Sequence, residues 1–180
     1  MIQSGCWRIL AARIDKGWVN IMRIAVGSDE RTHLTDVLVA ELQRRGHQVA
    51  LFGPLAGSKA AWPEVAHAVA REVAAGRSDE GIVLCWTGTG VSIAANKVPG
   101  IRAALCHDAE TARGARLWNH ANVLALSLRA TSEAVVKEIL DAWFATPPLG
   151  PTEEDRACVE RLREIERLYS AQVPEREVST

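Results

Sequence analysis

The sequence has little of several features that would assign it to other classes of protein. Its 21 lysines and arginines balance 22 aspartates and glutamates, so no excess charge would draw it to a nucleic acid or a membrane surface. No apolar run reaches the ~18 residues of a membrane-spanning helix. The four cysteines form no CxxC pair, which favours free thiols in a cytoplasmic protein. Tyrosine and phenylalanine are also scarce, with one and two residues, whereas tryptophan occurs six times.

The segment over 1–21 is unlike the chain that follows it. Arg8, Arg13 and Asp15 interrupt it, so it lacks the unbroken apolar middle of a signal peptide. Met22 stands directly before the first convincing strand. We therefore expect 1–21 to be an appendage, or the product of a start codon assigned too early, and the folded domain to begin at residue 22.

Five short apolar runs alternate with helical patterns over 22–146. Helices are predicted from about Leu34 to Gly46 and, further on, over 63–75, 91–97, 109–117 and from a cap at Thr131 to about residue 145. The runs between them lie over 22–28, 47–52, 81–85, 101–106 and 122–126. Each run is apolar enough to be buried on both faces, which is typical of a parallel sheet covered by helices on both sides. The sequence thus predicts a three-layer α/β/α, Rossmann-like domain with a five-stranded parallel sheet.

A C-terminal extension is expected over 147–180. Three prolines, Pro147, Pro148 and Pro151, break the chain after the predicted domain. A charged helix is predicted over 152–169, followed by a polar tail.

The segment IVLCWTGTGVSIAANK, over 82–97, lies where such a sheet binds ligands, at the carboxyl end of a strand. A glycine-rich turn after Cys85 opens a helix, and backbone N–H groups there can hold an anion. The spacing is neither that of a Walker loop nor GxGxxG. A cysteine near a helix N-terminus can serve as a base or nucleophile, although cysteine at a strand end is more often a core residue.

Four motifs together resemble the type B ribose-5-phosphate isomerases, a family that includes galactose-6-phosphate isomerase subunits. They are RIAVGSD (23–29), LCWTGTGVSIAANKVPGIRAAL (84–105), NHANVLALSLR (119–129) and ILDAWF (139–144). The resemblance covers about 22–169 and implies a flavodoxin-like sheet that interconverts aldose and ketose phosphates without a metal or other cofactor. It also implies a homodimer, or a dimer of dimers, with active sites shared between subunits. The C-terminal extension would then pack on the partner subunit.

The resemblance also implies roles for individual residues. Cys85 would move a proton between the first two sugar carbons through an enediolate, assisted by Thr87. Asn96 would brace the loop. Arg129 would hold the phosphate together with a second arginine, which would be Arg156 or, as the alternative, Arg161. For both of these C-terminal arginines, a place on a solvent-exposed helix face without a binding role is an equally good interpretation. The oxyanion and the sugar would be bound by Asp29, Gly88, Thr89, Gly90, Val91, Ser92, Asn119, Trp62 and Trp118.

Three departures from the family pattern concern the substrate. Glu30 stands where the family has a histidine, and Trp62 stands where it has a tyrosine. Trp118 replaces the histidine that opens the furanose ring, and an indole N–H only donates, so it cannot act as an acid or base. We also expect Trp62, Trp86 and Trp118 to lie near the pocket and shrink it.

Two explanations of the missing histidine remain open. His120 or His107 takes its place, or the substrate never forms a ring. In a tetrose 4-phosphate the oxygen that would close a five-membered ring carries the phosphate, so the sugar is open-chain. The candidate substrates are therefore ribose 5-phosphate and a tetrose 4-phosphate. A subunit of a hexose-6-phosphate isomerase, or a non-catalytic sugar-phosphate- or nucleotide-binding module, is the alternative.

Overall fold

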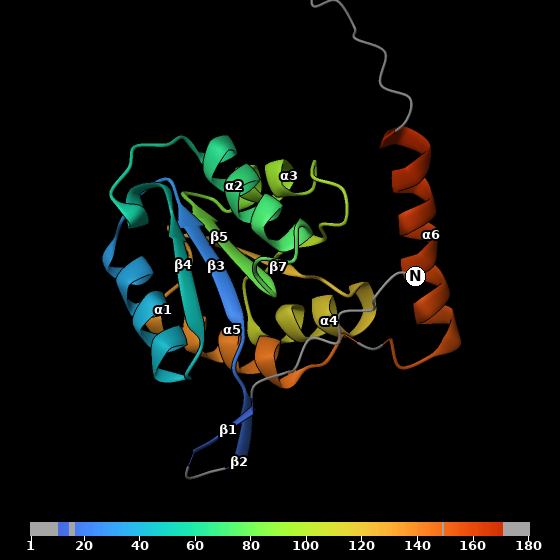
Figure 1. Cartoon of the computed structure of the whole chain (residues 1–180), viewed down its shortest axis with the longest axis horizontal. Helices are drawn as coiled ribbons and strands as arrows, with labels where there is room; N and C mark the ends of the chain where they lie inside the picture. Colours follow the sequence, from blue (N-terminus) through green and yellow to red (C-terminus); the bar gives the residue numbers. More distant parts are fainter. Residues whose placement is uncertain (1–10, 15–16, 149, 171–180) are drawn as a thin grey trace, which may run out of the picture.

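A parallel five-stranded sheet with helices on both faces forms the body of the computed structural model, which describes residues 11–14, 17–148 and 150–170 (Figure 1). This confirms the predicted fold class. If the five strands of the sheet, β3 to β7, are renumbered 1 to 5 in chain order, their order across the sheet is 2-1-3-5-4. The flavodoxin order is 2-1-3-4-5, so the last two strands are exchanged. In sheet order the strands are β4 (Gln48–Phe52), β3 (Arg23–Ser28), β5 (Glu80–Cys85), β7 (Val123–Ser127) and β6 (Ala103–Leu105).

The two faces of the sheet differ in the size of the side chains that they bury. One face packs isoleucine, leucine and valine side chains, such as Ile24 and Leu84, under α1 (His33–Arg44), α4 (Ala109–Asn119) and α5 (Glu133–Ala145). The other carries smaller residues, such as Ala25 and Cys85, under α2 (Trp62–Ala74) and α3 (Thr89–Ala95). A methyl group on Gly27 would lie 2.6 Å from Val65 Cγ1, so α2 packs closely only because that strand position is glycine. Cys85 belongs to this thinner face.

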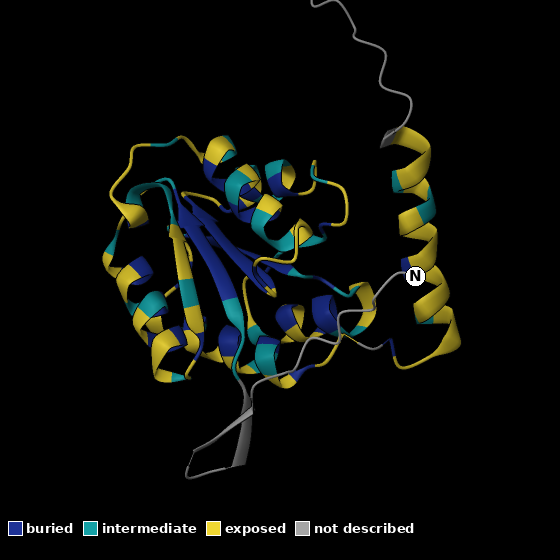
Figure 2. Cartoon of the chain, in the orientation of Figure 1, coloured by how far each residue is buried: buried dark blue, intermediate teal, exposed yellow. Residues whose placement is uncertain are grey.

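Two expectations about these elements were wrong in detail. The central strands β3, β5 and β7 are buried, but the edge strands β4 and β6 are largely half-buried or exposed (Figure 2), because a strand at the edge has a neighbour on one side only. The cap of α5 is Ser132, whose Oγ accepts a hydrogen bond from Val135 N at 3.3 Å, while Thr131 is buried in the preceding turn. The other predicted helices and strands lie within a few residues of their expected positions, whereas a short 3₁₀ helix, η1 (Gly53–Ala56), was not predicted.

Two further elements lie outside the sheet. An antiparallel hairpin, β1 (Ala11–Ile14) and β2 (Gly17–Asn20), precedes it and was not predicted. The predicted C-terminal helix is α6 (Glu153–Ser170), which stands apart from the sheet and contacts α4 (Figure 1). Residues 1–10 and 171–180, which include the predicted polar tail after Pro174, lie outside the described residues, and the domain boundary at residue 22 stays a prediction.

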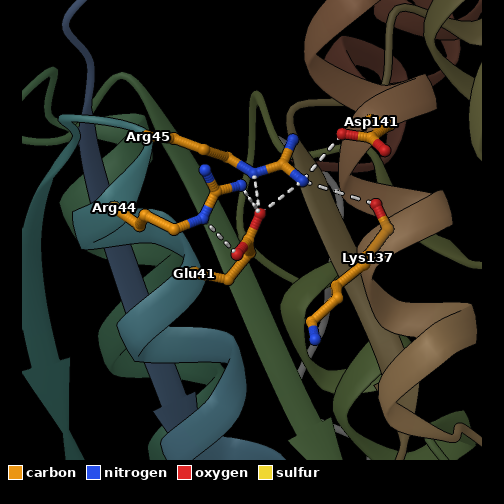
Figure 3. A network of polar contacts seen from close by, with 5 residues as sticks. All are labelled: Glu41, Arg44, Arg45, Lys137 and Asp141. Carbon is orange, nitrogen blue, oxygen red and sulfur yellow. Dashed lines mark hydrogen bonds and ion pairs between the residues drawn. The ribbon is translucent and has the colours of Figure 1, made fainter.

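A network of charges joins the end of α1 to α5 (Figure 3). The almost buried carboxylate of Glu41 accepts hydrogen bonds from Arg44, at 2.6 Å and 2.8 Å, and from Arg45, at 2.8 Å. Arg45 also pairs with Asp141 on α5 at 2.7 Å. The hydrogen bonds from Arg44, supported by those from Arg45, lower the pKa of Glu41 to about 2.

Candidate active site

Cys85 and Asp29 lie side by side at the carboxyl edge of the sheet. Ser28 on β3 is paired with Leu84 on β5, so the residues that follow them are neighbours. From β3 the chain crosses to β4 on one side and later returns to β5 on the other, which makes this the topological switch point where open α/β sheets bind ligands. We call the residues that gather here the carboxyl-edge half of the site: Asp29, Trp62, Cys85, Trp86, Thr87, 88–92 and Arg129.

The turn after Cys85 requires the glycine that follows it. The carbonyl oxygen of Cys85 accepts hydrogen bonds from Gly88 N at 3.2 Å and from Leu128 N at 3.0 Å, which ties the turn to the end of β7. Gly88 has a φ of 77°, in the left-handed region. A methyl group there would lie 2.5 Å from Leu105 Cδ1 and 2.9 Å from the Leu126 carbonyl. A side chain of β6 and the backbone of β7 therefore fix the path by which the chain enters α3.

The predicted oxyanion residues do not all offer a free N–H group. Gly88 N is bonded within the turn, and Ser92 N donates to Gly88 O at 3.2 Å. The hydroxyl of Ser92 points to Ala103 O, at 3.4 Å. The N–H groups of 89–91 belong to the first turn of α3, where a helix supplies no partner. These three N–H groups, rather than five, are the ones available to an oxyanion.

The polar side chains around the turn are only partly paired. Thr87 Oγ1 lies 2.7 Å from Thr89 Oγ1, so one hydroxyl orients the other. The Oδ1 atom of Asp29 is buried and has no hydrogen-bond partner within the described part of the chain, and burial raises the pKa of this carboxyl group. A buried polar atom normally has a partner, so Asp29 is a candidate to accept a hydrogen bond from a ligand.

Arg129 and two tryptophans complete the carboxyl-edge half. Arg129 is exposed on the loop after β7, and its N–H donates to Trp86 O at 3.1 Å. Trp62, the first residue of α2, lies against Gly90, where an added methyl group would be 3.0 Å from its Cε3. Trp86 and Trp62 are 59% and 42% exposed, which is high for such apolar side chains.

Trp118 and Asn119 lie elsewhere, at the end of α4. They line a groove of about 1220 Å³ between α4, the edge strand β6 and α6. We call the lining side chains of this groove the groove half of the site; besides Trp118 and Asn119 they include Arg102, Leu162, Arg163, Ile165 and Tyr169.

The structure does not bring the two halves together within one chain. Asn119 is followed after a short turn by Val123, the first residue of β7, whereas Cys85 is paired with Ser127, its last residue. Four residues of a strand span about 13 Å. Cys85 is not among the residues that line the groove. The expectation that Trp118 would lie near Trp62 and Trp86 is therefore not met in a single chain.

Buried charges hold the turn that follows Asn119. Arg116 donates to Ala121 O at 2.6 Å and pairs with Glu80 at 2.5 Å, and both side chains are almost fully buried. Trp143 donates its indole N–H to the same carboxylate, and its ring lies 4.9 Å from the Arg116 guanidinium. Burial raises the pKa of Glu80, while the charge of Arg116 opposes that shift. Such a pair is costly to break, because the remaining charge would be buried alone.

Comparison with known proteins identifies the family of this chain. Residues 24–160 match the family model described as Ribose/Galactose Isomerase. The chain belongs to this family. It is 39% identical to D-erythrulose-4-phosphate isomerase of Pectobacterium atrosepticum over 69% of this chain and 83% of that protein. It is 38% identical to ribose-5-phosphate isomerase B of Escherichia coli over 81% and 97%.

The fold agrees with that of solved members. Ribose-5-phosphate isomerase B of Clostridium thermocellum superposes with a TM-score of 0.76 at 38% identity, covering 82% of this chain and 99% of that one. The protein is therefore an enzyme of the isomerase class, in the sugar-phosphate isomerase family. No group of three His, Cys, Asp or Glu side chains placed to hold a metal ion occurs among the described residues. Likewise, none of the helices described for this isomerase is long and apolar enough to cross a membrane.

The two candidate replacements for the ring-opening histidine occupy different surroundings. His120 caps α4 in the left-handed conformation, with a φ of 50°, and its Nε2 is buried without a hydrogen-bond partner among the described residues. A methyl group on Gly150 would lie 3.1 Å from that nitrogen. Burial, followed by the charge of Arg102, lowers the pKa of His120. His107 is exposed just before α4.

The arginines expected to bind phosphate are also placed differently from one another. Arg156, at the start of α6, donates to Gly150 O at 2.9 Å, and Arg161 pairs with Glu164 at 2.7 Å on the same helix. Sequence reasoning missed Arg102 and Arg163, which line the groove. Arg102 stands inside a recognised motif, immediately before a strand, and that position was its only signal.

The side-chain amide of Asn96 bonds Ala103 N and O, both at 2.8 Å, and so braces the end of α3 against β6.

Proposed function

We propose that this isomerase interconverts the aldose and ketose forms of a phosphorylated sugar by proton transfer at Cys85. The observation that carries the proposal is the thiol at the end of β5, beside the first turn of α3 and the unpartnered carboxylate of Asp29. The Cys85 thiolate takes the proton from carbon 2 of the aldose, and the electron pair of that C–H bond forms an enediolate. The thiol then returns the proton to carbon 1, while the hydroxyl proton on oxygen 2 moves to oxygen 1.

The remaining groups of the carboxyl-edge half stabilise the enediolate in this proposal. Free N–H groups over 89–91 donate hydrogen bonds to the developing oxyanion, and one such donor is typically worth about 10²–10³ in rate. Thr87 donates to the sugar oxygens with its own hydroxyl oriented by Thr89. The Asp29 carboxylate accepts a hydrogen bond from a sugar hydroxyl and thereby gains its missing partner.

A second copy of the chain supplies the groove half. The end of α4 lies too far from Cys85 for Asn119 of the same chain to contact the sugar, so we propose that each site combines the carboxyl-edge half of one subunit with the groove half of the other. Exposed apolar side chains on α6, Leu162, Ile165 and Tyr169, line the groove and would be covered in such a homodimer. Arg129 and the partner chain's copy of Arg156 would then hold the phosphate, because a guanidinium fork matches its oxygens.

The proposed substrate is a tetrose 4-phosphate. Trp118 stands where the family has its ring-opening histidine, and the buried Nε2 of His120 is enclosed by the turn at Gly150 rather than facing the groove. An open-chain sugar needs no ring opener. Relatives named for both sugars have similar identity to this chain, at 39% for D-erythrulose 4-phosphate and 38% for ribose 5-phosphate, so the choice rests on Trp118 and His120.

A panel of substrates tests the proposal. We expect kcat/KM for D-erythrose 4-phosphate and D-erythrulose 4-phosphate to exceed that for ribose 5-phosphate by at least about tenfold, as for pockets that discriminate by size. Trp118→His should raise turnover of ribose 5-phosphate. Preference for ribose 5-phosphate or a hexose 6-phosphate would refute the tetrose assignment but leave the isomerase. Binding without turnover of any member would instead indicate the non-catalytic module.

A further inference from the structure

Gly114 is an unexpected residue for the interior of α4, because glycine weakens a helix relative to alanine. It is buried, and Trp118 lies one turn further along on the same face. Side chains on a helix lean toward its N-terminus, which brings the indole of Trp118 back over Gly114. A methyl group on Gly114 would lie 2.7 Å from Cζ3 and 3.0 Å from Cε3 of that indole.

The same arrangement recurs in the carboxyl-edge half. A methyl group on Gly90 would lie 3.0 Å from Cε3 and 3.1 Å from Cδ2 of Trp62. Both tryptophans were linked to the substrate from the sequence, and both remain more than 40% exposed, at 42% and 46%. Each indole thus rests directly against a helix backbone at a glycine while leaving much of its surface open.

We infer that Gly114 is a positioning residue for the isomerase reaction. Because it has no side chain, the indole of Trp118 can pack directly against the backbone of α4, and the position of this ring sets the length of sugar that the shared site accepts. Carbon atoms in contact lie about 3.5–4.0 Å apart, so an alanine methyl would push the ring outward by roughly 1 Å. The displaced ring would enter the groove that Gly114 and Trp118 both line. A displacement of about 1 Å in a site can change rates by about 10²-fold.

The consequence for the sugar rests on the proposed function, whereas the position of the indole does not. The test therefore has two readouts. With 5-fluorotryptophan incorporated, the protein gives fluorine NMR signals from six tryptophans, and the Trp118 signal is assigned by its loss in Trp118→Ala. The second readout is the ratio of kcat/KM for D-erythrose 4-phosphate to that for ribose 5-phosphate.

Gly114→Ala is made in the wild-type and in the Trp118→Ala background. In the wild-type background we expect the Trp118 signal to move, and the ratio of kcat/KM to change by about tenfold or more. In the Trp118→Ala background the same substitution should change the ratio by less than about twofold, because its effect passes through the indole. Glu138→Ala, at an exposed position of α5 outside both halves of the site, is the control and should leave both readouts unchanged.

Several results would overturn the inference. A Trp118 signal that does not move in Gly114→Ala shows that the glycine does not position the indole. An equal change of the ratio in both backgrounds shows that Gly114 acts through the helix. A signal that moves in an enzyme without activity on any sugar phosphate upholds the position of the indole and refutes the proposed function instead. Circular dichroism confirms that each variant is folded.

Discussion

The carboxyl-edge half and the groove half differ in how completely their backbone and polar groups are paired. In the carboxyl-edge half, Asp29 keeps a buried oxygen without a partner, and the first N–H groups of α3 have none in their helix. In the turn that carries the groove half, the carbonyls of 117, 120 and 121 accept hydrogen bonds from Gly150 N, Arg102 and Arg116 at 2.6–3.1 Å.

Because their hydrogen bonding differs, the two halves suit different steps of the proposed reaction. Unpaired donors and acceptors can bind a charge that develops during reaction, because they need not first break other hydrogen bonds. The turn after α4 has its backbone carbonyls bonded and holds its side chains in place, and its one unpartnered buried atom among the described residues, His120 Nε2, lies against Gly150 rather than in the groove. We therefore assign proton transfer to the first half and selection of the sugar to the second.

The largest expected effect comes from replacing Cys85, at the end of a strand, by alanine. Cys106, which follows another strand, is the residue for comparison. Cys85→Ala should reduce kcat by about 10²–10⁴-fold, the range for loss of a general acid–base group. Cys106 is fully buried, and burial, aided by Asp108, raises the pKa of its thiol to about 12, so it cannot ionise at neutral pH. Cys106→Ala should leave kcat within about twofold and cost about 1 kcal/mol of stability.

The measurement is steady-state turnover of a tetrose phosphate, with binding of inorganic phosphate followed by calorimetry as the control for folding. Full turnover in Cys85→Ala would remove the proposed base. An equal loss in Cys106→Ala would show that the contrast between the two thiols has no catalytic meaning.

The sequence was sufficient for five parallel strands and for the place of Cys85, but insufficient for the order of the last two strands and for the relation between the halves. Apolar runs bounded by turns mark buried strands directly, and the thiol's place at a strand end follows from them. Glu80, in contrast, precedes such a run and reads as a surface charge until Arg116, 36 positions later by sequence number, is seen beside it. The contact of Trp118 with Gly114 also depends on a side-chain direction that spacing alone does not fix.

A second prediction concerns the separation of the halves. Neither Cys85→Ala nor Asn119→Ala should be active alone, but co-expression with two affinity tags yields mixed dimers in which one site has both native residues. If sites are shared, an equal mixture should recover about a quarter of wild-type activity, since about half the dimers are mixed and each has one intact site. If one chain forms a whole site, no activity returns. Two copies of Cys85→Ala with different tags serve as the control and should remain inactive in either case.

The smallest expected effect lies outside both halves, in the network of Glu41. Because the folded-state pKa of Glu41, about 2, is below its ordinary value of 4.5, its ion pairs contribute stability above pH 4.5 that is lost as the pH falls toward 2. Glu41→Gln should therefore lower the free energy of unfolding at pH 7 by about 1–2 kcal/mol, with the difference from wild type shrinking below pH 4.5. Urea unfolding at pH 7 and pH 3.5 measures it.

Asp36 lies on the same helix as Glu41 and forms an exposed ion pair with Arg31, which precedes that helix; Asp36→Asn is the matched control and should cost at most about 1 kcal/mol. Because Glu41 orients Arg45, which joins α1 to Asp141 of α5 away from Cys85 and from the groove, its replacement should leave kcat and KM at pH 7 unchanged. A loss of turnover without a loss of stability would contradict the placement of all the chemistry in the two halves. Equal destabilisation at both pH values would show that Glu41 acts through packing rather than through its charge.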